Sequence, residues 1–304
     1  MKTMTSWGLM AGLTVSTAMA AEAQSPAAAQ PPGQERPLVL FVGDSITAGA
    51  PTGNAGYQPS EPAPSARFLA GRYGYVEALW EATRETGVPY RFDKLGNGGQ
   101  PITGWIGNMC RQVLEGRNRD ISEPPAYLVV QDFVGVGTVD GKTTTEDDIV
   151  KAVGSIVESA RKSRGTKIIL STPVMEPGGT WSGKVPPDAI KDSGAAFLKA
   201  AERFKLPVVR LDRAWERYLA AFGKRTPSKD WQLTNRGSSY DGVHPGKVGA
   251  LFQALVFARE LGIPAEQFDE ANPQLGVEKA QAAEIEAFVY GWTDPTVVAV
   301  TDDK

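Results

Sequence analysis

The stretch PLVLFVGDSITAGA, from Pro37 to Ala50, joins a run of apolar residues to a Gly-Asp-Ser turn. A short apolar run rich in branched and aromatic side chains predicts a buried β-strand over 37–42. Ligands of parallel α/β sheets bind at the carboxyl ends of the strands, so Ser45 lies where a site is expected. A serine in a glycine-rich turn is more often only a turn residue, and its hydroxyl is a weak nucleophile until a base removes the proton. The remaining sequence must therefore supply that base.

Four further apolar runs follow, each with the composition of a buried strand. They cover 90–95, 126–131, 167–171 and 207–211. Apolar residues spaced by three and four predict helices over 75–86, 149–161, 189–204 and 248–261. Thr145 and the acidic residues after it are typical of a helix start, and Gly165 of a helix end. The alternation predicts an α/β protein with a five-stranded parallel sheet covered by helices on both faces.

The two ends of the chain differ in composition from its middle. Residues 1–24 combine Lys2, an apolar stretch and alanines at cleavage-type spacing, which predicts a secretory signal peptide and a secreted or periplasmic protein. The segment 25–36 is rich in Pro, Ala and Gln and is interpreted as a flexible linker. The main domain is expected over 37–263. Residues 264–304 are expected to form an extension, with a helix over 277–290, that packs on this domain.

Composition limits the classes of function. The chain has 304 residues, of which 41% are hydrophobic and 22% charged, with a formal charge of −3. The chain has no overall positive charge that would favour the binding of nucleic acid. No integral membrane segment is expected in the mature chain. One cysteine, Cys110, and one histidine exclude an internal disulfide and a structural metal site of the Cys or His type. Cys110 is expected to be buried.

The single histidine, His244, is the candidate base. Asp241 precedes it by three residues, and Pro245 is expected to be the first residue of the helix that follows. An aspartate at this spacing can accept the proton of one ring nitrogen and leave the other free to take a proton from a serine. Asp44, next to Ser45, is instead expected to cap its own turn.

The blocks GDSI at 43–46 and DGVHP at 241–245 resemble those of the GDSL or SGNH hydrolase family. Gly-Asp-Ser alone is frequent by chance, but the two blocks in this order on an α/β pattern are specific. The resemblance covers about Pro37 to Leu261. It implies a three-layer α/β/α sandwich with a flavodoxin-like sheet, and a catalytic triad of Ser45, Asp241 and His244 that hydrolyses esters through an acyl-enzyme.

Two middle blocks of the family supply donors to the oxyanion. GNGGQPITGW, at 96–105, resembles the Gly-Gly-Thr-Pro-Ile-x-x-Trp loop of the carbohydrate acetylesterase branch, which implies the backbone N–H of Gly99 as a donor beside that of Ser45. The same branch has a glutamine at the end of the third strand, where this chain has Gln131 in VVQDF. Asn97 and the backbones of Gly135 and Gly137 remain alternatives to Gln131.

The sequence thus predicts a serine esterase that acts, without a cofactor, on O-acyl and mainly O-acetyl esters of a carbohydrate or polysaccharide. A lipid or aryl esterase and a polysaccharide O-acetyltransferase remain alternatives. A different class, a polysaccharide-binding protein with impaired catalysis, also remains open. Four tryptophans could stack on sugars or simply fill the core, and three long insertions are expected to form pocket walls. These are Trp105, Trp181, Trp231 and Trp292, and the insertions 50–72, 173–187 and 223–240.

Overall fold

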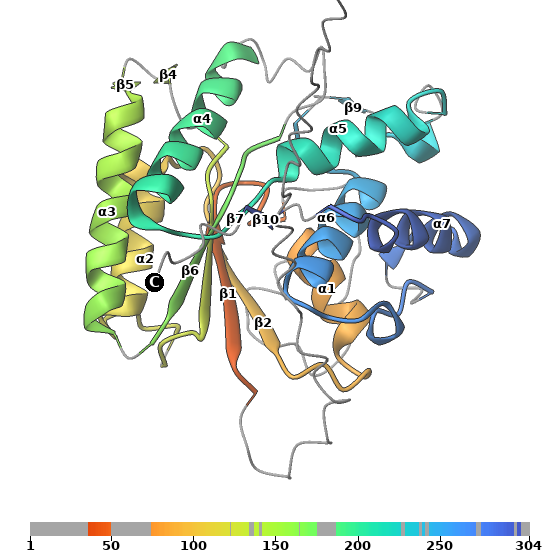
Figure 1. Cartoon of the computed structure of the whole chain (residues 1–304), viewed down its shortest axis with the longest axis horizontal. Coiled ribbons are helices and arrows are strands. Elements are labelled where there is room, and N and C mark those ends of the chain that lie inside the picture. Colours follow the sequence, from red (N-terminus) through yellow and green to blue (C-terminus); the bar gives the residue numbers. More distant parts are fainter. Residues whose placement is uncertain are drawn as a thin grey trace, which may run out of the picture. The chain divides into compact units, whose positions relative to one another are not determined.

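Six strands form the central sheet of the protein, shown as a computed structural model in Figure 1, in the order β10-β7-β6-β3-β1-β2. The strands are β1 (Leu38–Gly43), β2 (Arg91–Gly96), β3 (Tyr127–Gln131), β6 (Lys167–Ser171), β7 (Val208–Val209) and β10 (Val297–Val298). All neighbours in the row β7-β6-β3-β1-β2 are parallel, which confirms the predicted flavodoxin-like sheet. The sixth strand, β10, was not predicted; it pairs with β7 in the antiparallel direction.

The structure describes most of the chain after residue 35. The described residues are 36–49, 74–121, 123–133, 137–139, 142–163, 165–174, 187–225, 229–236, 239–240, 243–271, 275–294 and 297–298. The predicted signal peptide, nearly all of the predicted linker and the insertion 50–72 lie outside this description. Among the described residues, no helix has the length and apolar character needed to cross a membrane.

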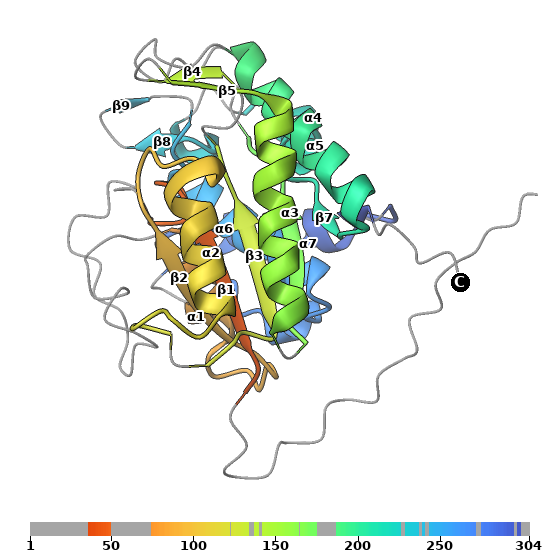
Figure 2. The same ribbon diagram turned by 90° about the vertical axis from the view of Figure 1, so that its left-hand side faces the viewer.

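Helices cover both faces of the sheet, as Figures 1 and 2 show. One layer contains α2 (Gly107–Leu114), α3 (Glu146–Lys162) and α4 (Pro187–Phe204). The other contains α1 (Tyr75–Thr83), α5 (Leu211–Phe222), α6 (Lys247–Glu260) and α7 (Lys279–Tyr290). The predicted three-layer α/β/α sandwich is therefore confirmed.

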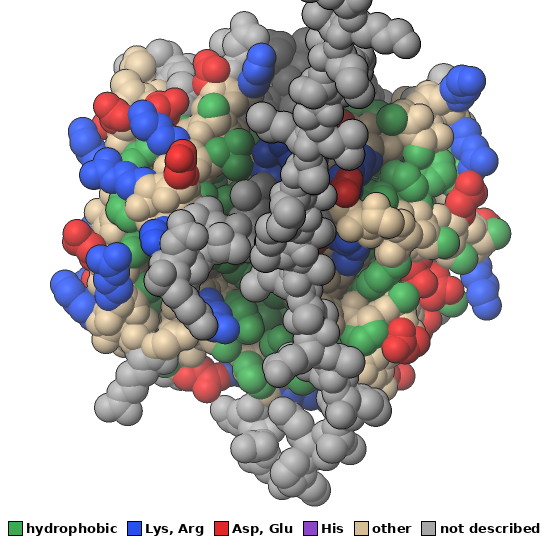
Figure 3. Space-filling view, viewed as in Figure 1, with side chains coloured by type: hydrophobic (Ala, Val, Ile, Leu, Met, Phe, Trp, Pro, Cys, Tyr) green, Lys and Arg blue, Asp and Glu red, His purple; other side chains and the backbone are tan. Residues whose placement is uncertain are grey.

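Short elements connect these layers. They are the π-helix η2 (Ile102–Ile106), the 3-10 helices η3 (Lys229–Trp231) and η4 (Ala265–Gln267), and the two-stranded pairs β4 (Gly137–Val139) with β5 (Lys142–Thr144) and β8 (Asn235–Arg236) with β9 (Ser239–Tyr240). On the face of the molecule shown in Figure 3, basic and acidic side chains are interspersed.

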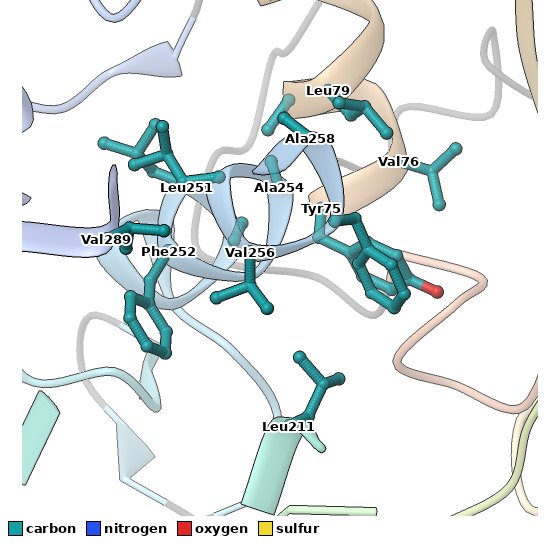
Figure 4. Close-up of a cluster of buried hydrophobic side chains, with 14 of the residues drawn as sticks. Tyr75, Val76, Leu79, Leu211, Leu251, Phe252, Ala254, Val256, Ala258 and Val289 are labelled. Carbon is teal, nitrogen blue, oxygen red and sulfur yellow. The ribbon is translucent and has the colours of Figure 1, made fainter. Parts of the chain in front are cut away.

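The alternation of side chains along β1 divides the core in two. Val39 and Phe41 pack in the cluster beneath α1, α5, α6 and α7, whereas Leu40 and Val42 pack in the cluster beneath α2, α3 and α4. Figure 4 shows part of the first cluster, where side chains of α1 and α6 meet. Burial on both faces explains why the strands read as continuous apolar runs.

The N-termini of α3 and α6 can be compared with the helix starts that the sequence predicts. Thr145 caps α3, because its Oγ1 accepts a hydrogen bond from the Asp148 N–H at 3.2 Å and its own N–H donates to the Asp148 carboxylate at 3.0 Å. The prediction that Pro245 begins the last helix of the main domain was wrong. Helix α6 begins at Lys247, because the N–H of Gly246 donates to the Leu233 carbonyl at 2.8 Å and holds this residue in an extended conformation before the helix.

The C-terminal segment contributes side chains to the core cluster beneath α1, α5, α6 and α7. Ala282, Ile285 and Val289 of α7 are fully buried in that cluster, and the helix follows the predicted span closely. Helix α7 packs against α6, and every residue of α6 from Val248 to Ala258 is buried, so α6 is apolar on nearly all sides.

Candidate active site

The first and last motifs of the chain meet in one hydrogen bond. Ser45 follows β1 and His244 precedes α6, 199 residues later, and the Ser45 Oγ lies 2.8 Å from the Nε2 of His244. The imidazole is 6% exposed, while the serine is half-buried. A nucleophile and a base within hydrogen-bond distance at the carboxyl edge of a parallel sheet can perform covalent catalysis. Asp241, the predicted third member of the triad, lies outside the described residues.

Asp44 fixes the turn that carries Ser45. Its Oδ1 accepts a hydrogen bond from the N–H of Ile46 at 2.9 Å, which agrees with the predicted cap. Its Oδ2 accepts a second hydrogen bond from the N–H of Phe133 at 2.7 Å, and this contact was not predicted. Burial raises the pKa of the Asp44 carboxyl, while these two hydrogen bonds and nearby His244 favour the charged form. Asp44 thus joins the turn after β1 to the loop after β3.

The loop after β2 passes close to the nucleophile. A Cβ built on Gly98 would lie 3.5 Å from the Cβ of Ser45, and the neighbouring Gly99 has a φ of +69°, which favours glycine. The loop is fixed before this point by the Asn97 N–H, which donates to the Gly43 carbonyl at 3.1 Å. It is fixed after it by the Ile102 N–H, which donates to the buried carboxylate of Asp132 at 2.7 Å. The loop that contains Gly99 is therefore fixed on both sides, and its Gly98 backbone lies beside Ser45.

Gln131 ends β3 and is 1% exposed. Its side-chain carbonyl oxygen accepts hydrogen bonds from the Thr47 hydroxyl and the Tyr75 hydroxyl, each at 3.1 Å. Its amide nitrogen is buried and has no partner among the described residues. A buried amide N–H without an acceptor costs about 1–3 kcal/mol, so an acceptor placed beside this nitrogen would be bound favourably.

The alternatives to Gln131 occupy different positions. Asn97 is exposed on the loop after β2. Gly137 lies in β4, where it pairs with Thr144 of β5. Gly135 lies outside the described residues.

A buried ion pair, which the sequence analysis missed, supports the end of the nucleophile turn. Lys94 of β2 pairs with Glu77 of α1, and its Nζ donates to the Ala48 carbonyl at 3.0 Å. The other carboxylate oxygen of Glu77 accepts a hydrogen bond from the Gly74 N–H at 3.1 Å. Burial raises the pKa of Glu77, and the charge of Lys94 opposes this effect. Because both charges interrupt apolar patterns, they were the sequence signal for a buried pair.

Two of the four tryptophans are partly buried and pack against the core cluster beneath α1, α5, α6 and α7. Trp231 stacks on Phe222 with ring centroids 5.2 Å apart, and Trp292 packs edge-on against Phe288 at 5.3 Å. Trp105 is partly buried against the α2 and α3 cluster. Trp181 lies outside the described residues. Trp105, Trp231 and Trp292 thus each make packing contacts and keep part of their surface exposed.

Cys110 is a free, buried thiol, as predicted, and burial raises its pKa. Across the described part of the chain, no three His, Cys, Asp or Glu side chains are grouped so that they could hold a metal ion.

Solved structures with the same fold include hydrolases of the GDSL type. A candidate GDSL-like lipase from Parabacteroides merdae is 20% identical, with a TM-score of 0.52, over 76% of this chain and 98% of that chain. An alpha/beta hydrolase enzyme from the metagenome of Lake Arreo and a catalytic mutant of an acetylxylan esterase from Geobacillus stearothermophilus are each 20% identical with a TM-score of 0.50. Each match covers 75% of this chain and 95% of the other. No family model and no curated protein matches the sequence.

At the level of the fold, these likenesses confirm the resemblance to GDSL or SGNH hydrolases that the sequence motifs indicate. The chain has the fold of the GDSL-like hydrolases, with a hydrogen-bonded serine and histidine at the carboxyl edge of its sheet.

Proposed function

We propose that the protein is a serine esterase of the SGNH type. The observation that carries this proposal is the 2.8 Å hydrogen bond between Ser45 Oγ and His244 Nε2, formed by two motifs from opposite ends of the domain. The fold shared with esterases and lipases supports the same class of reaction. Asp241 is proposed to accept a hydrogen bond from the other ring nitrogen and hold the tautomer in which Nε2 is unprotonated.

The reaction has two steps that use one base. His244 Nε2 takes the hydroxyl proton while Ser45 Oγ forms a bond to the ester carbonyl carbon. The tetrahedral intermediate collapses, the bond to the alcohol oxygen breaks, and His244 returns the proton to the leaving alcohol. Water then gives a proton to His244 and attacks the acyl carbon. When this second intermediate collapses, the bond from the acyl carbon to Ser45 Oγ breaks, His244 returns its proton to Oγ, and the acid is released.

Three donors are proposed to hold the oxyanion of each intermediate. Two are the backbone N–H groups of Ser45 and Gly99, supported by the approach of the Gly98 backbone to Ser45. The third is the side-chain amide of Gln131, supported by its buried nitrogen, which has no partner in the described part of the chain. Donors held in place before charge develops lower the barrier without reorganisation.

The proposed substrates are O-acetyl esters of a carbohydrate or polysaccharide, met by an exported enzyme after removal of the signal peptide. Two similarities support this substrate class: the likeness of the 96–105 loop to that of carbohydrate acetylesterases, and the fold shared with an acetylxylan esterase.

Steady-state hydrolysis of p-nitrophenyl acetate and of acetylated xylooligosaccharides tests the proposal. Ser45→Ala and His244→Ala should each lower kcat by about 10³-fold or more, with unchanged thermal unfolding. Release of acetate from the oligosaccharide supports the substrate class. Wild-type protein that binds the oligosaccharide but releases no acid from either ester would instead identify a binding protein.

A further inference from the structure

Three buried polar side chains from three separate elements meet behind the nucleophile turn. Thr47 lies in that turn, Tyr75 is the first residue of α1, and Gln131 is the last residue of β3. Their exposed fractions are 0%, 1% and 1%. The Thr47 and Tyr75 hydroxyls lie 3.1 Å from the Gln131 Oε1, and the two hydroxyl oxygens are 3.2 Å apart.

The hydrogen count fixes the orientation of the amide. Each hydroxyl carries one hydrogen and needs one acceptor, and the Gln131 carbonyl oxygen has two lone pairs that accept both. If the amide turned over, its NH2 group would face two hydroxyl oxygens, and one hydroxyl hydrogen would lose its acceptor within this buried group. The carbonyl oxygen therefore faces Thr47 and Tyr75, and the amide nitrogen points away from them.

The surroundings keep this arrangement rigid. The Tyr75 ring packs edge-on against Phe41, with centroids 5.5 Å apart, and is stacked on Phe257 at 5.2 Å. A Cβ built on Gly43 would lie 2.2 Å from the Thr47 Oγ1, so glycine at this position allows Thr47 to reach Gln131. Burial also raises the pKa of the Tyr75 hydroxyl, which keeps it protonated and able to donate in alkaline solution.

We propose that Thr47 and Tyr75 are positioning residues that hold the Gln131 amide with its nitrogen free to donate to the oxyanion. This inference rests on the proposed function and assigns to the Gly-Asp-Ser turn a second task. The turn carries the nucleophile and, two residues later, a hydroxyl that orients an oxyanion donor on another strand. Neither hydroxyl needs to touch the substrate.

A double-mutant cycle on kcat tests the coupling. Tyr75→Phe and Thr47→Val should each lower kcat about three- to tenfold with little change in KM, because a net hydrogen bond is worth up to about that factor. In a Gln131→Ala background the same changes should lower kcat by less than about twofold. Thr47→Ser, which keeps the hydroxyl, should retain wild-type kcat. Equal losses in both backgrounds, or no loss in either, would overturn the proposal.

A matched control separates the loss of a buried hydroxyl from a general packing defect. Tyr218 is also buried, and its hydroxyl donates to the Trp231 carbonyl at 3.0 Å. Tyr218→Phe should leave kcat unchanged. A loss as large as that of Tyr75→Phe would argue against a specific role of Tyr75.

Side-chain amide NMR of Gln131 tests the orientation without any esterase assay. The NH2 signals, assigned by their absence in Gln131→Ala, should shift or broaden in Tyr75→Phe and Thr47→Val and stay unchanged in Tyr218→Phe. Unchanged signals in both variants would overturn the positioning role even in an active esterase. Shifted signals in a protein without ester hydrolysis would show that the proposed function had failed, and with it the catalytic purpose of the positioning.

Discussion

At the scale of single residues, the sequence predicted the reactive pair and missed its support. Ser45 and His244 are marked by short motifs, since each lies next to residues that restrict a turn or a helix start. Thr47 and Tyr75 carry no such mark, because their role depends on where β3 places Gln131. A hydrogen bond between residues 56 positions apart, such as that of Tyr75 to Gln131, appears only when the strand order is known.

Gln131 gives the sharpest prediction at this scale. Gln131→Ala should lower kcat about 10²- to 10³-fold with little change in KM, because the donor acts only as negative charge develops on the substrate oxygen. Gln131→Glu should be at least as harmful, since a carboxylate repels the oxyanion. Kinetics on one acetyl ester measure both, with thermal unfolding as the check on folding. A loss below about threefold in each variant would remove Gln131 from the site.

At the scale of elements, the five parallel strands were predicted, whereas the short strands outside them and the connections were not. The five apolar runs became the five parallel strands because burial on both faces leaves an unmistakable composition. Helices α2 and α5 were not predicted. Helix α2 continues from η2, whose Gly104 has φ and ψ of −122° and −114°, outside the helical region. The start of α6 was misjudged because the contact of Gly246 with Leu233 is tertiary. Neither the break in the helix at Gly104 nor the contact of Gly246 with Leu233 can be read from the spacing of apolar residues in the sequence.

The N-cap of α3 yields a stability prediction. Thr145→Ala should lower the free energy of unfolding by about 1 kcal/mol, because the Asp148 N–H loses its acceptor at the first turn. Ser155→Ala, in the middle of the same helix, serves as the control and should be neutral or slightly stabilising. Chemical denaturation measures both. Equal effects of the two substitutions would mean that the cap does not contribute.

Asp132 connects two elements, and its removal should affect catalysis through the loop after β2. Asp132→Ala removes the acceptor of the Ile102 N–H, so the loop of Gly98 and Gly99 should lose its fixed position near Ser45. We expect a fall in kcat of about tenfold or more, with partial recovery in Asp132→Asn, which keeps an oxygen acceptor. Wild-type kcat in Asp132→Ala would show that this tether does not position the loop.

At the scale of the whole molecule, the C-terminal segment was expected only to pack on the domain. The structure shows α7 within the main core and β10 as an antiparallel edge strand. A strand of two residues has no readable period, so its pairing could not be predicted. The domain boundary at 263 remains a prediction, as do the signal peptide and the linker.

The α7 helix also carries a pH-sensitive group. Burial and neighbouring Glu270 raise the pKa of Glu286 to about 7, against an ordinary value of 4.5. The folded protein therefore binds this proton more tightly than the unfolded chain, and between pH 4.5 and 7 the contribution of Glu286 to stability falls as the pH rises. Glu286→Gln should flatten that part of the curve and raise the melting temperature above pH 7.

Melting temperatures from pH 4.5 to 8 test this prediction. Glu284→Gln is the control, since Glu284 lies on the same helix and faces Arg225 at 2.7 Å. It should keep the wild-type slope. A wild-type slope in Glu286→Gln would contradict the assignment.

The central claim, an activated nucleophile at Ser45, is tested most directly by covalent labelling. Folded protein treated with a fluorophosphonate should gain the mass of one adduct, and peptide mapping should place it on Ser45. Ser45→Ala should remain unlabelled, and His244→Ala should react far more slowly, because the hydroxyl then lacks the base 2.8 Å away. An unlabelled wild-type protein, or an adduct that persists on Ser45→Ala, would contradict the account.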